Sequence, residues 1–233
     1  MNLYLLEQDI SDCSEGSDFH YNTLLNNPAV SLLETVDDFP FDGIFFQNVK
    51  TINRDTSCIF EPEHYLPSYL ISVFPSSDRY LLLNNDLKIV EYDLYKRSRL
   101  DRKVFIKPYD ILKGFSPTCL NKGDTLASLN LEVNQDLAIF PFKDIYNSIE
   151  YRCVIVDNQI VSIINTQEDK PTPTEAYIFV ETACLENLQD VSTYVLDILY
   201  WRDLFLVVEI NPLETSGFFG NYDSIIHSLR GLT

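Results

Sequence analysis

Two apolar runs near the end of the sequence constrain the fold more than any other feature. The runs TYVLDILYW and LFLVVEINP are rich in β-branched and aromatic residues, and only Arg202-Asp203 separates them. This composition and spacing predict two adjacent strands joined by a short turn. Each run nevertheless contains polar residues, with Asp197 in the first and Glu209 and Asn211 in the second. A buried carboxylate is costly unless it is paired or bound to a metal, so these positions require a reason.

Strand geometry places these polar residues together. Because side chains alternate between faces, Val207, Glu209 and Asn211 are expected on one face, with Glu209 and Asn211 roughly 7 Å apart along the strand. Across the short turn, Asp197 can lie near Glu209. Two carboxylates and an amide oxygen suit Mg²⁺, which usually takes one or two carboxylates and completes its shell with water and phosphate. The alternative is an edge strand whose polar face meets solvent, and Pro212 is compatible with that alternative.

The remaining segments predict a protein of mixed α and β structure. Asp157-Asn158 lies between two β-rich runs and both residues tolerate positive φ, so residues 148–166 are expected to form a hairpin. Thr174 is the expected N-cap of a helix within residues 171–189. Further strands are expected within residues 3–6, 41–49, 104–108 and 136–142, and helical segments within residues 21–36, 61–77 and 222–232.

Composition disfavours several classes of protein. The chain has 233 residues, 45% hydrophobic and 13% aromatic, so a packed core is expected in one large or two small domains. A formal net charge of −18 repels DNA and RNA at long range, so nucleic acid is a disfavoured partner. The five cysteines are scattered without metal-binding spacing, which favours reduced thiols in the cytoplasm. No apolar run approaches the ~20 residues of a membrane span, and the acidic N-terminal segment does not resemble a signal peptide.

Basic residues that could bind phosphate are few. Lys107 ends the run VFIK and Lys113 follows in the next loop, where each could contact phosphate or solvent. Arg152 shares a strand face with Glu150, and it could pair with that residue or with Glu168 at the surface. Alternatively, its guanidinium could bind a phosphate or a substrate carboxylate through two parallel hydrogen bonds. The chain contains no GxxxxGK[ST], GxGxxG or GxSxG motif.

Taken in order, four blocks resemble the ATP-grasp superfamily, and within it a clade of small bacterial and phage proteins named for one arginine and two lysines. The blocks are VFIKPYDILKGF, IEYRCVIVDNQIVSI, YVLDI and VVEINPLETSGFFGNYDSIIHSL. They resemble, in turn, the family's nucleotide-binding strand with its lysine-bearing loop, its E-Y-R hairpin, the strand with its first metal-binding acid, and its closing block with an E-x-N metal pair. The order and spacing of the blocks carry the resemblance, which covers about residues 100–233.

The resemblance implies a fold and a set of site residues. The fold class is α+β, a two-lobed ATP-grasp fold with ATP held between the lobes. Residues 86–233 would form the ATP-grasp domain and residues 1–85 a small N-terminal α/β pre-grasp domain. The implied Mg²⁺ ligands are Asp197, Glu209 and Asn211. The implied contacts to ATP are Lys107, Lys113, Ile139, Phe140, Phe142 and Glu150, with the backbone of AIFPF reading the adenine edge. The implied catalytic residues are Arg152 and Lys113.

The implied activity is that of an ATP-dependent carboxylate–amine ligase. A carboxylate would attack ATP, an acyl phosphate would form, and an amine would displace phosphate to give an amide or peptide bond. Its partners would be a small-molecule or peptide carboxylate and amine. Two alternatives share the site: a non-catalytic ATP-binding assembly protein with a basic protein partner, and a kinase-like phosphotransferase. The stretches GFSPT and INTQEDKP depart from the family pattern and leave the substrates open.

Overall fold

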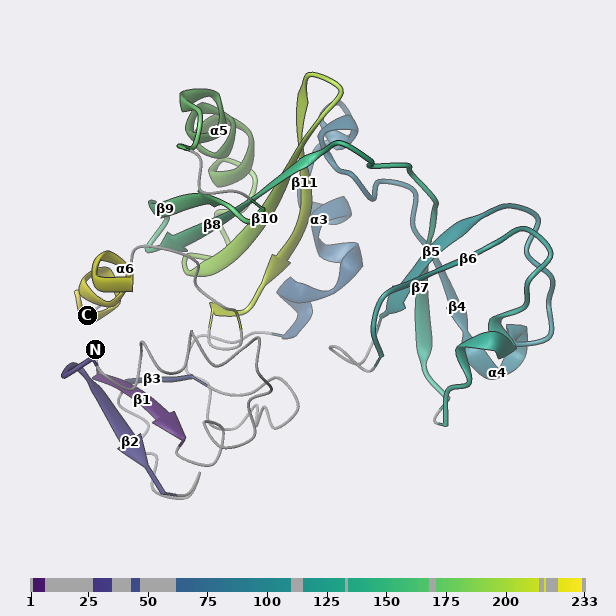
Figure 1. Cartoon of the computed structure of the whole chain (residues 1–233), viewed down its shortest axis with the longest axis horizontal. Coiled ribbons are helices and arrows are strands. Elements are labelled where there is room, and N and C mark those ends of the chain that lie inside the picture. The colour runs from purple at the N-terminus through teal and green to yellow at the C-terminus, as the bar shows by residue number, and fades with distance from the viewer. Residues whose placement is uncertain are drawn as a thin grey trace. The chain divides into compact units, whose positions relative to one another are not determined.

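The computed structural model describes residues 2–6, 27–34, 43–46, 62–109, 115–132, 134–167, 171–213, 216 and 222–231. The chain divides into two compact units (Figure 1). The first unit combines Met1–Glu61 with Ile149–Thr233, and the second is Pro62–Ser148. These units are defined by contacts in space, so they do not test the predicted division into residues 1–85 and 86–233, which stays a prediction.

The first unit is built on a four-stranded antiparallel sheet with strand order β11-β10-β8-β9. Its strands are β8 (Ile149–Val156), β9 (Gln159–Asn165), β10 (Tyr194–Trp201) and β11 (Leu204–Asn211). Both hairpins close through two residues with positive φ: 51° and 57° at Asp157 and Asn158, and 51° and 61° at Arg202 and Asp203. This is the backbone that two-residue hairpin turns need. The two predicted hairpins are therefore confirmed.

Helices cover the two faces of this sheet. Helix α5 (Thr174–Phe179) continues as a π-helical turn, η6 (Val180–Leu185), and its Phe179 ring stacks 5.6 Å from Phe205 of β11. On the opposite face, α6 (Tyr222–Arg230) buries apolar side chains against the sheet and against β1. This core comprises Leu3, Leu5, Val154, Val156, Val195, Leu213, Ile225, Ile226 and Leu229. The predicted C-terminal amphipathic helix is confirmed.

A three-stranded parallel sheet of order β2-β1-β3 completes the first unit. It comprises β1 (Asn2–Leu6), β2 (Val30–Leu33) and β3 (Gly43–Phe46). The predicted helical segment within residues 21–36 is wrong over its described part, residues 27–34, because Val30–Leu33 pairs in parallel with β1. The apolar run satisfies its backbone hydrogen bonds through this long-range partner, which a local pattern does not reveal. The rest of that prediction, residues 21–26 and 35–36, lies outside the described residues.

The second unit holds a four-stranded antiparallel sheet of order β4-β7-β5-β6. Its strands are β4 (Lys88–Glu91), β5 (Val104–Pro108), β6 (Thr118–Leu120) and β7 (Asp136–Pro141). Strands β5 and β7 confirm two predictions, while β4 and β6 were not predicted because they are only four and three residues long. The short helical segments are η3 (Pro62–Tyr65), α3 (Pro67–Val73), η4 (Arg79–Leu81), α4 (Tyr92–Tyr95) and η5 (Leu126–Leu129).

Helix α5 begins one residue earlier than the sequence predicts. Pro173, rather than Thr174, is the N-cap of α5, with φ −68° and ψ 147° and no side-chain cap hydrogen bond. The extended backbone of proline suits this position, and Thr174 becomes the first helical residue. Among the described residues, no helix is long and apolar enough to cross a membrane. Short helices with mainly antiparallel sheets confirm the α+β class.

Candidate functional site

Five polar side chains gather on one face of the sheet in the first unit. Arg152 of β8, Asp197 of β10 and Glu209 of β11 lie opposite one another across three neighbouring strands. Glu150 lies two residues before Arg152, and Asn211 lies two residues after Glu209, so strand alternation brings both to the same face. The predicted proximity of Asp197 and Glu209 is confirmed. We call this set the polar face.

A bulge in β11 changes the alternation of side chains beside the polar face. Asp197 pairs with Glu209, but the next residue, Ile198, pairs with Val207, so Val208 is the extra residue. Val207 therefore shares a face with Ile198 and is fully buried. The predicted common face of Val207 and Glu209 is wrong, because an inserted residue shifts the alternation by one position.

Arg152 holds the buried Asp197 with two hydrogen bonds. Its Nε donates to Oδ1 of Asp197 at 2.8 Å and its Nη2 donates to Oδ2 at 2.9 Å. Asp197 is only 1% exposed. This two-pronged ion pair supplies the counter-charge that a buried carboxylate needs. The partners expected from the sequence were Glu150 and Glu168, whereas Asp197 was missed because the pairing arises between strands distant in sequence.

Asn211 bridges the two metal-ligand candidates. Its Nδ2 donates to Oδ2 of Asp197 at 3.0 Å and to Oε1 of Glu209 at 3.2 Å. A metal ligand would instead use the amide oxygen, which a half-turn of the terminal amide would present, since the two orientations are assigned from hydrogen bonding alone. The oxygen-rich donor set fits Mg²⁺. Among the described residues, no group of three or more His, Cys, Asp or Glu side chains is placed to hold a metal, and the third ligand predicted from the sequence is this amide.

The charges on the polar face influence one another. Burial, followed by the charge of Asp197, raises the pKa of Glu150, although Arg152 opposes this shift. Burial lowers the pKa of Arg152, but its hydrogen bonds and attraction to Asp197 outweigh burial and leave the pKa raised. Three carboxylates therefore surround one guanidinium. Their excess negative charge favours the approach of a cation.

The described residues of the second unit that are predicted to contact ATP lie on β5 and on or just after β7. Lys107 is half-buried in β5, opposite Ala138 of β7, whereas Lys113 lies outside the described residues. Ile139 packs into the core of this unit, and the ring of Phe140 lies 6.4 Å from that of Phe105. Both side chains are nearly buried, with exposures of 9% and 1%. The assignments of these residues to ATP stay predictions.

Two further lysines lie next to the predicted adenine segment, and neither was identified from the sequence. Lys103 places its Nζ 3.6 Å from the centre of the Phe142 ring, and Lys143 donates from its Nζ to the backbone oxygen of Leu83. Burial lowers the pKa of Lys143, although Asp86 opposes this shift. The position of Lys143 directly after AIFPF could have marked it in the sequence, whereas Lys103 is distant in sequence and meets Phe142 only through the fold.

The fold and the polar face together define the class of protein. A model of an ATP-grasp domain, that of family 2 in the clade named for one arginine and two lysines, matches residues 86–224, which is more than half of the chain. The chain therefore belongs to family 2 of this ATP-grasp clade, and the predicted family is confirmed. No curated protein matches.

Solved structures agree with this assignment at the level of the fold. The D-cycloserine synthetase DcsG is similar with a TM-score of 0.61 and 12% identity, over 98% of this chain and 97% of that one. D-alanine–D-alanine ligase from Bacillus anthracis has a TM-score of 0.53 and 12% identity, over 93% and 88% of the two chains. C-terminally truncated Cdc123 from Schizosaccharomyces pombe has a TM-score of 0.50 and 14% identity, over 76% and 96%. The predicted ATP-grasp fold is confirmed.

Proposed function

We propose that this protein is an ATP-dependent carboxylate–amine ligase that forms a carbon–nitrogen bond with the help of Mg²⁺. The observation that carries the proposal is the polar face, where three carboxylates, an amide and a guanidinium meet on three neighbouring strands. Membership of an ATP-grasp family supports ATP as the phosphate donor. The similar structures that are ligases share the fold, and their activity comes to this chain only as part of the proposal.

Asp197, Glu209 and Asn211 are the proposed ligands of the ion. When bound, Mg²⁺ would neutralise and orient the phosphate oxygens of ATP. Both oxygens of Asp197 already accept hydrogen bonds from Arg152 or Asn211. Ligation would therefore require the Asn211 amide to turn and Arg152 to release part of its hold on Asp197. The same movement would leave guanidinium hydrogens available for a substrate.

The proposed reaction has two steps. An oxygen of the substrate carboxylate attacks the γ-phosphorus, the bond to ADP breaks, and an acyl phosphate forms. The amine nitrogen then attacks the acyl carbon, phosphate leaves, and the amine loses a proton. Arg152 would hold the carboxylate and then the acyl phosphate, while Lys107 and Lys113 would offset the phosphate charge. These residues act mainly by positioning and charge neutralisation, which phosphoryl transfer requires.

The remaining assignments concern the nucleoside part of ATP. The backbone of AIFPF would read the adenine edge, and Phe142, which is half-buried, would contact a face of the ring. Ile139 and Phe140 would contribute mainly by shaping the strand, because both are nearly buried. Glu150 is half-buried on the polar face and would accept a hydrogen bond from the nucleotide.

Calorimetric titration with Mg-ATP tests the metal assignment. Glu209→Gln keeps the size of the side chain and removes its charge, so we expect Mg-ATP affinity to fall at least tenfold while the fold survives. Glu181→Gln is the matched control, because Glu181 is exposed on η6 of the same unit. Lys107→Ala should also weaken affinity. Equal affinity in wild type and Glu209→Gln would remove the metal assignment.

A screen for ADP release tests the reaction itself. Candidate acids would be supplied with ATP and with hydroxylamine, which traps an acyl phosphate as a hydroxamate. A hydroxamate formed with one class of acid would support the acyl-phosphate step of the proposed ligase reaction. An amide detected by mass spectrometry after addition of an amine would support the second step. Phosphorylation of a hydroxyl compound would point to a kinase instead. ATP binding without ADP release, together with a stable partner in pull-down, would support the assembly alternative.

A further inference from the structure

The buried carboxylate of Asp197 is already occupied by groups of the protein itself. Its two oxygens offer about four positions for hydrogen-bond donors or a metal ion. Nε of Arg152, Nη2 of Arg152 and Nδ2 of Asn211 take at least three of these positions, at 2.8, 2.9 and 3.0 Å. An ion that binds Asp197 therefore meets a carboxylate whose oxygens are largely in use.

The guanidinium of Arg152 is the stronger of the two occupants. It carries a full charge and donates two parallel hydrogen bonds to Asp197, whereas the amide of Asn211 is neutral and can turn about its terminal bond. The ion pair is also shielded from water, because the side chains of Arg152 and Asp197 are only 19% and 2% exposed. Salt and water screen such a pair far less than they screen a pair at the surface.

Arg152 and a divalent cation require the same carboxylate. Arg152 lies opposite Asp197 across β8 and β10, and Glu209 lies opposite Asp197 across β10 and β11. The guanidinium and an ion held by Asp197 and Glu209 would therefore be close neighbours of like charge. Like charges at short distance in a poorly screened site repel each other strongly, so each weakens the hold of the other on Asp197.

We propose that Arg152 competes with the metal ion for Asp197, so that binding of the ion and release of the guanidinium are one coupled event. This inference rests on the proposed function, because it takes Asp197 and Glu209 as ligands of the ion. It gives Arg152 a role that precedes any contact with substrate. In the free protein, its ion pair with Asp197 keeps the affinity of the site for Mg²⁺ low.

Titration of the full chain with Mn²⁺ alone, followed by electron paramagnetic resonance, tests the competition, with Mn²⁺ in place of Mg²⁺. Arg152→Met removes the guanidinium, so we expect this variant to bind Mn²⁺ at least tenfold more tightly than wild type. Arg152→Lys keeps a positive charge beside Asp197, which favours folding, but it cannot donate from two nitrogens in a fixed fork. Its affinity should lie between those of wild type and Arg152→Met.

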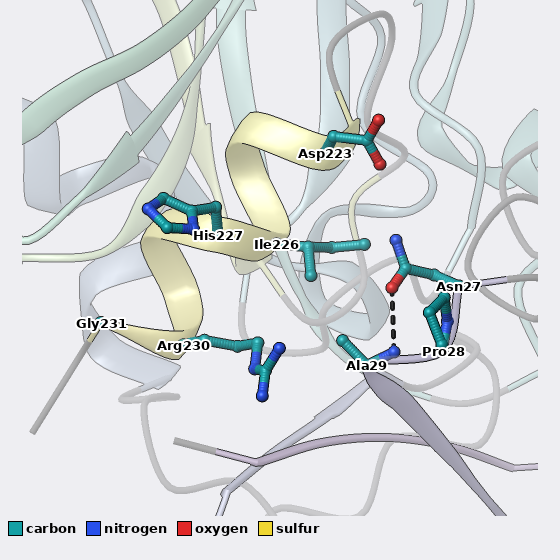
Figure 2. Close-up of a pocket in the computed structure, with 8 residues that line it drawn as sticks. All are labelled: Asn27, Pro28, Ala29, Asp223, Ile226, His227, Arg230 and Gly231. Carbon is teal, nitrogen blue, oxygen red and sulfur yellow. Dashed lines mark hydrogen bonds between the residues drawn. The ribbon is translucent and has the colours of Figure 1, made fainter.

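Two controls separate this site from the other acids of the chain. Glu209→Gln removes a proposed ligand, so it should weaken Mn²⁺ binding at least tenfold, both alone and combined with Arg152→Met. Asp223 lines a separate pocket of about 680 Å³ between α6 and Asn27–Ala29, to which no residue of the polar face contributes (Figure 2). Asp223→Asn should therefore leave the affinity for Mn²⁺ unchanged, although it removes an exposed carboxylate from the same unit.

Urea unfolding measures the same coupling through stability. With Mg²⁺ well above both dissociation constants, the deficit of Arg152→Met relative to wild type should shrink by about 1.4 kcal/mol for a tenfold ratio of affinities. If Mn²⁺ binding depended on Glu209 but were no tighter in the two Arg152 variants than in wild type, this inference would be overturned and the proposed metal site would stand. Absence of Glu209-dependent binding in every variant would overturn both.

Discussion

The ion pair of Arg152 with Asp197 bears on both the stability of the fold and the proposed activity. Asp197 is almost fully buried, and Arg152 is the cation that neutralises it in the structure. The family resemblance implies that Arg152 binds substrate and that Asp197 binds Mg²⁺. In the structure, the two side chains are hydrogen-bonded to each other. Any variant of either residue therefore acts on the free energy of unfolding as well as on activity.

We expect Arg152→Met to lower the free energy of unfolding by about 3 kcal/mol, because it leaves a buried carboxylate without its counter-charge. The double variant Arg152→Met/Asp197→Leu should recover part of this loss, since it removes both charges. The control is Arg102→Met, because the ion pair of Arg102 with Asp101 is exposed and should contribute little. Urea unfolding measures all three. Equal losses for Arg152→Met and Arg102→Met would contradict the structural role.

Glu150 should make stability depend on pH. Burial and the charge of Asp197 raise its pKa above the ordinary 4.5, so the folded protein holds this proton more strongly than the unfolded chain. The resulting stabilisation is present below pH 4.5 and is lost as pH rises through the raised pKa. Glu150→Gln should therefore be more stable than wild type at about pH 7, with the difference shrinking at acidic pH. Urea unfolding across this range, without nucleotide, would show a constant difference if the carboxyl were unperturbed.

At the scale of elements, two tight hairpins order the strands that carry the polar face. Both turns use two consecutive residues with positive φ, and none of these four residues is glycine. Strand β8 then pairs with β10, which brings the two hairpins into one sheet. The position of Arg152 opposite Asp197 depends on this register, because a slip by one residue would move every side chain to the other face.

The turn at Asn158 offers a test of this dependence. Its φ is 57°, which asparagine and glycine tolerate and β-branched residues do not. Asn158→Val should lower the free energy of unfolding by about 1–2 kcal/mol, whereas Asn158→Gly should leave it unchanged or slightly raised. Thermal unfolding of both variants makes the comparison. If Asn158→Val left the free energy of unfolding unchanged, the backbone of this turn would have to differ from the one described.

At the scale of the whole molecule, net charge governs which partners approach. The formal charge of −18 extends over a chain with only 17 lysines and arginines. Salt screens this field over about 10 Å at ordinary ionic strength, so it affects encounter more than contact. We therefore expect the field to favour the encounter of cationic small molecules, peptides and basic proteins over that of nucleic acids.

We expect no mobility shift with single-stranded DNA, double-stranded DNA or tRNA at micromolar protein, even at low salt and with Mg-ATP present. Repulsion between the acidic surface and the phosphate backbone is the reason. An electrophoretic mobility assay performs the test, with a basic DNA-binding protein as positive control. A tight shift with any of these nucleic acids would contradict the expectation and redirect the search for substrates towards nucleic acid.

The sequence by itself determined the hairpins, the C-terminal helix and the meeting of Asp197 with Glu209. These features depend on residues close together in the chain: alternation along a strand, turn residues that accept positive φ, and apolar spacing along a helix. The order of four blocks also sufficed for the family, which the family model confirms over residues 86–224.

Only the tertiary structure decided the features that depend on distant partners. Val30–Leu33 is a strand because it pairs with β1. Arg152 forms an ion pair with Asp197 because β8 pairs with β10. The bulge at Val208 moved Val207 into the core, although simple alternation placed it with Glu209. In each case the free energy of a long-range pairing outweighs a local preference, and a local pattern carries no information about such a partner.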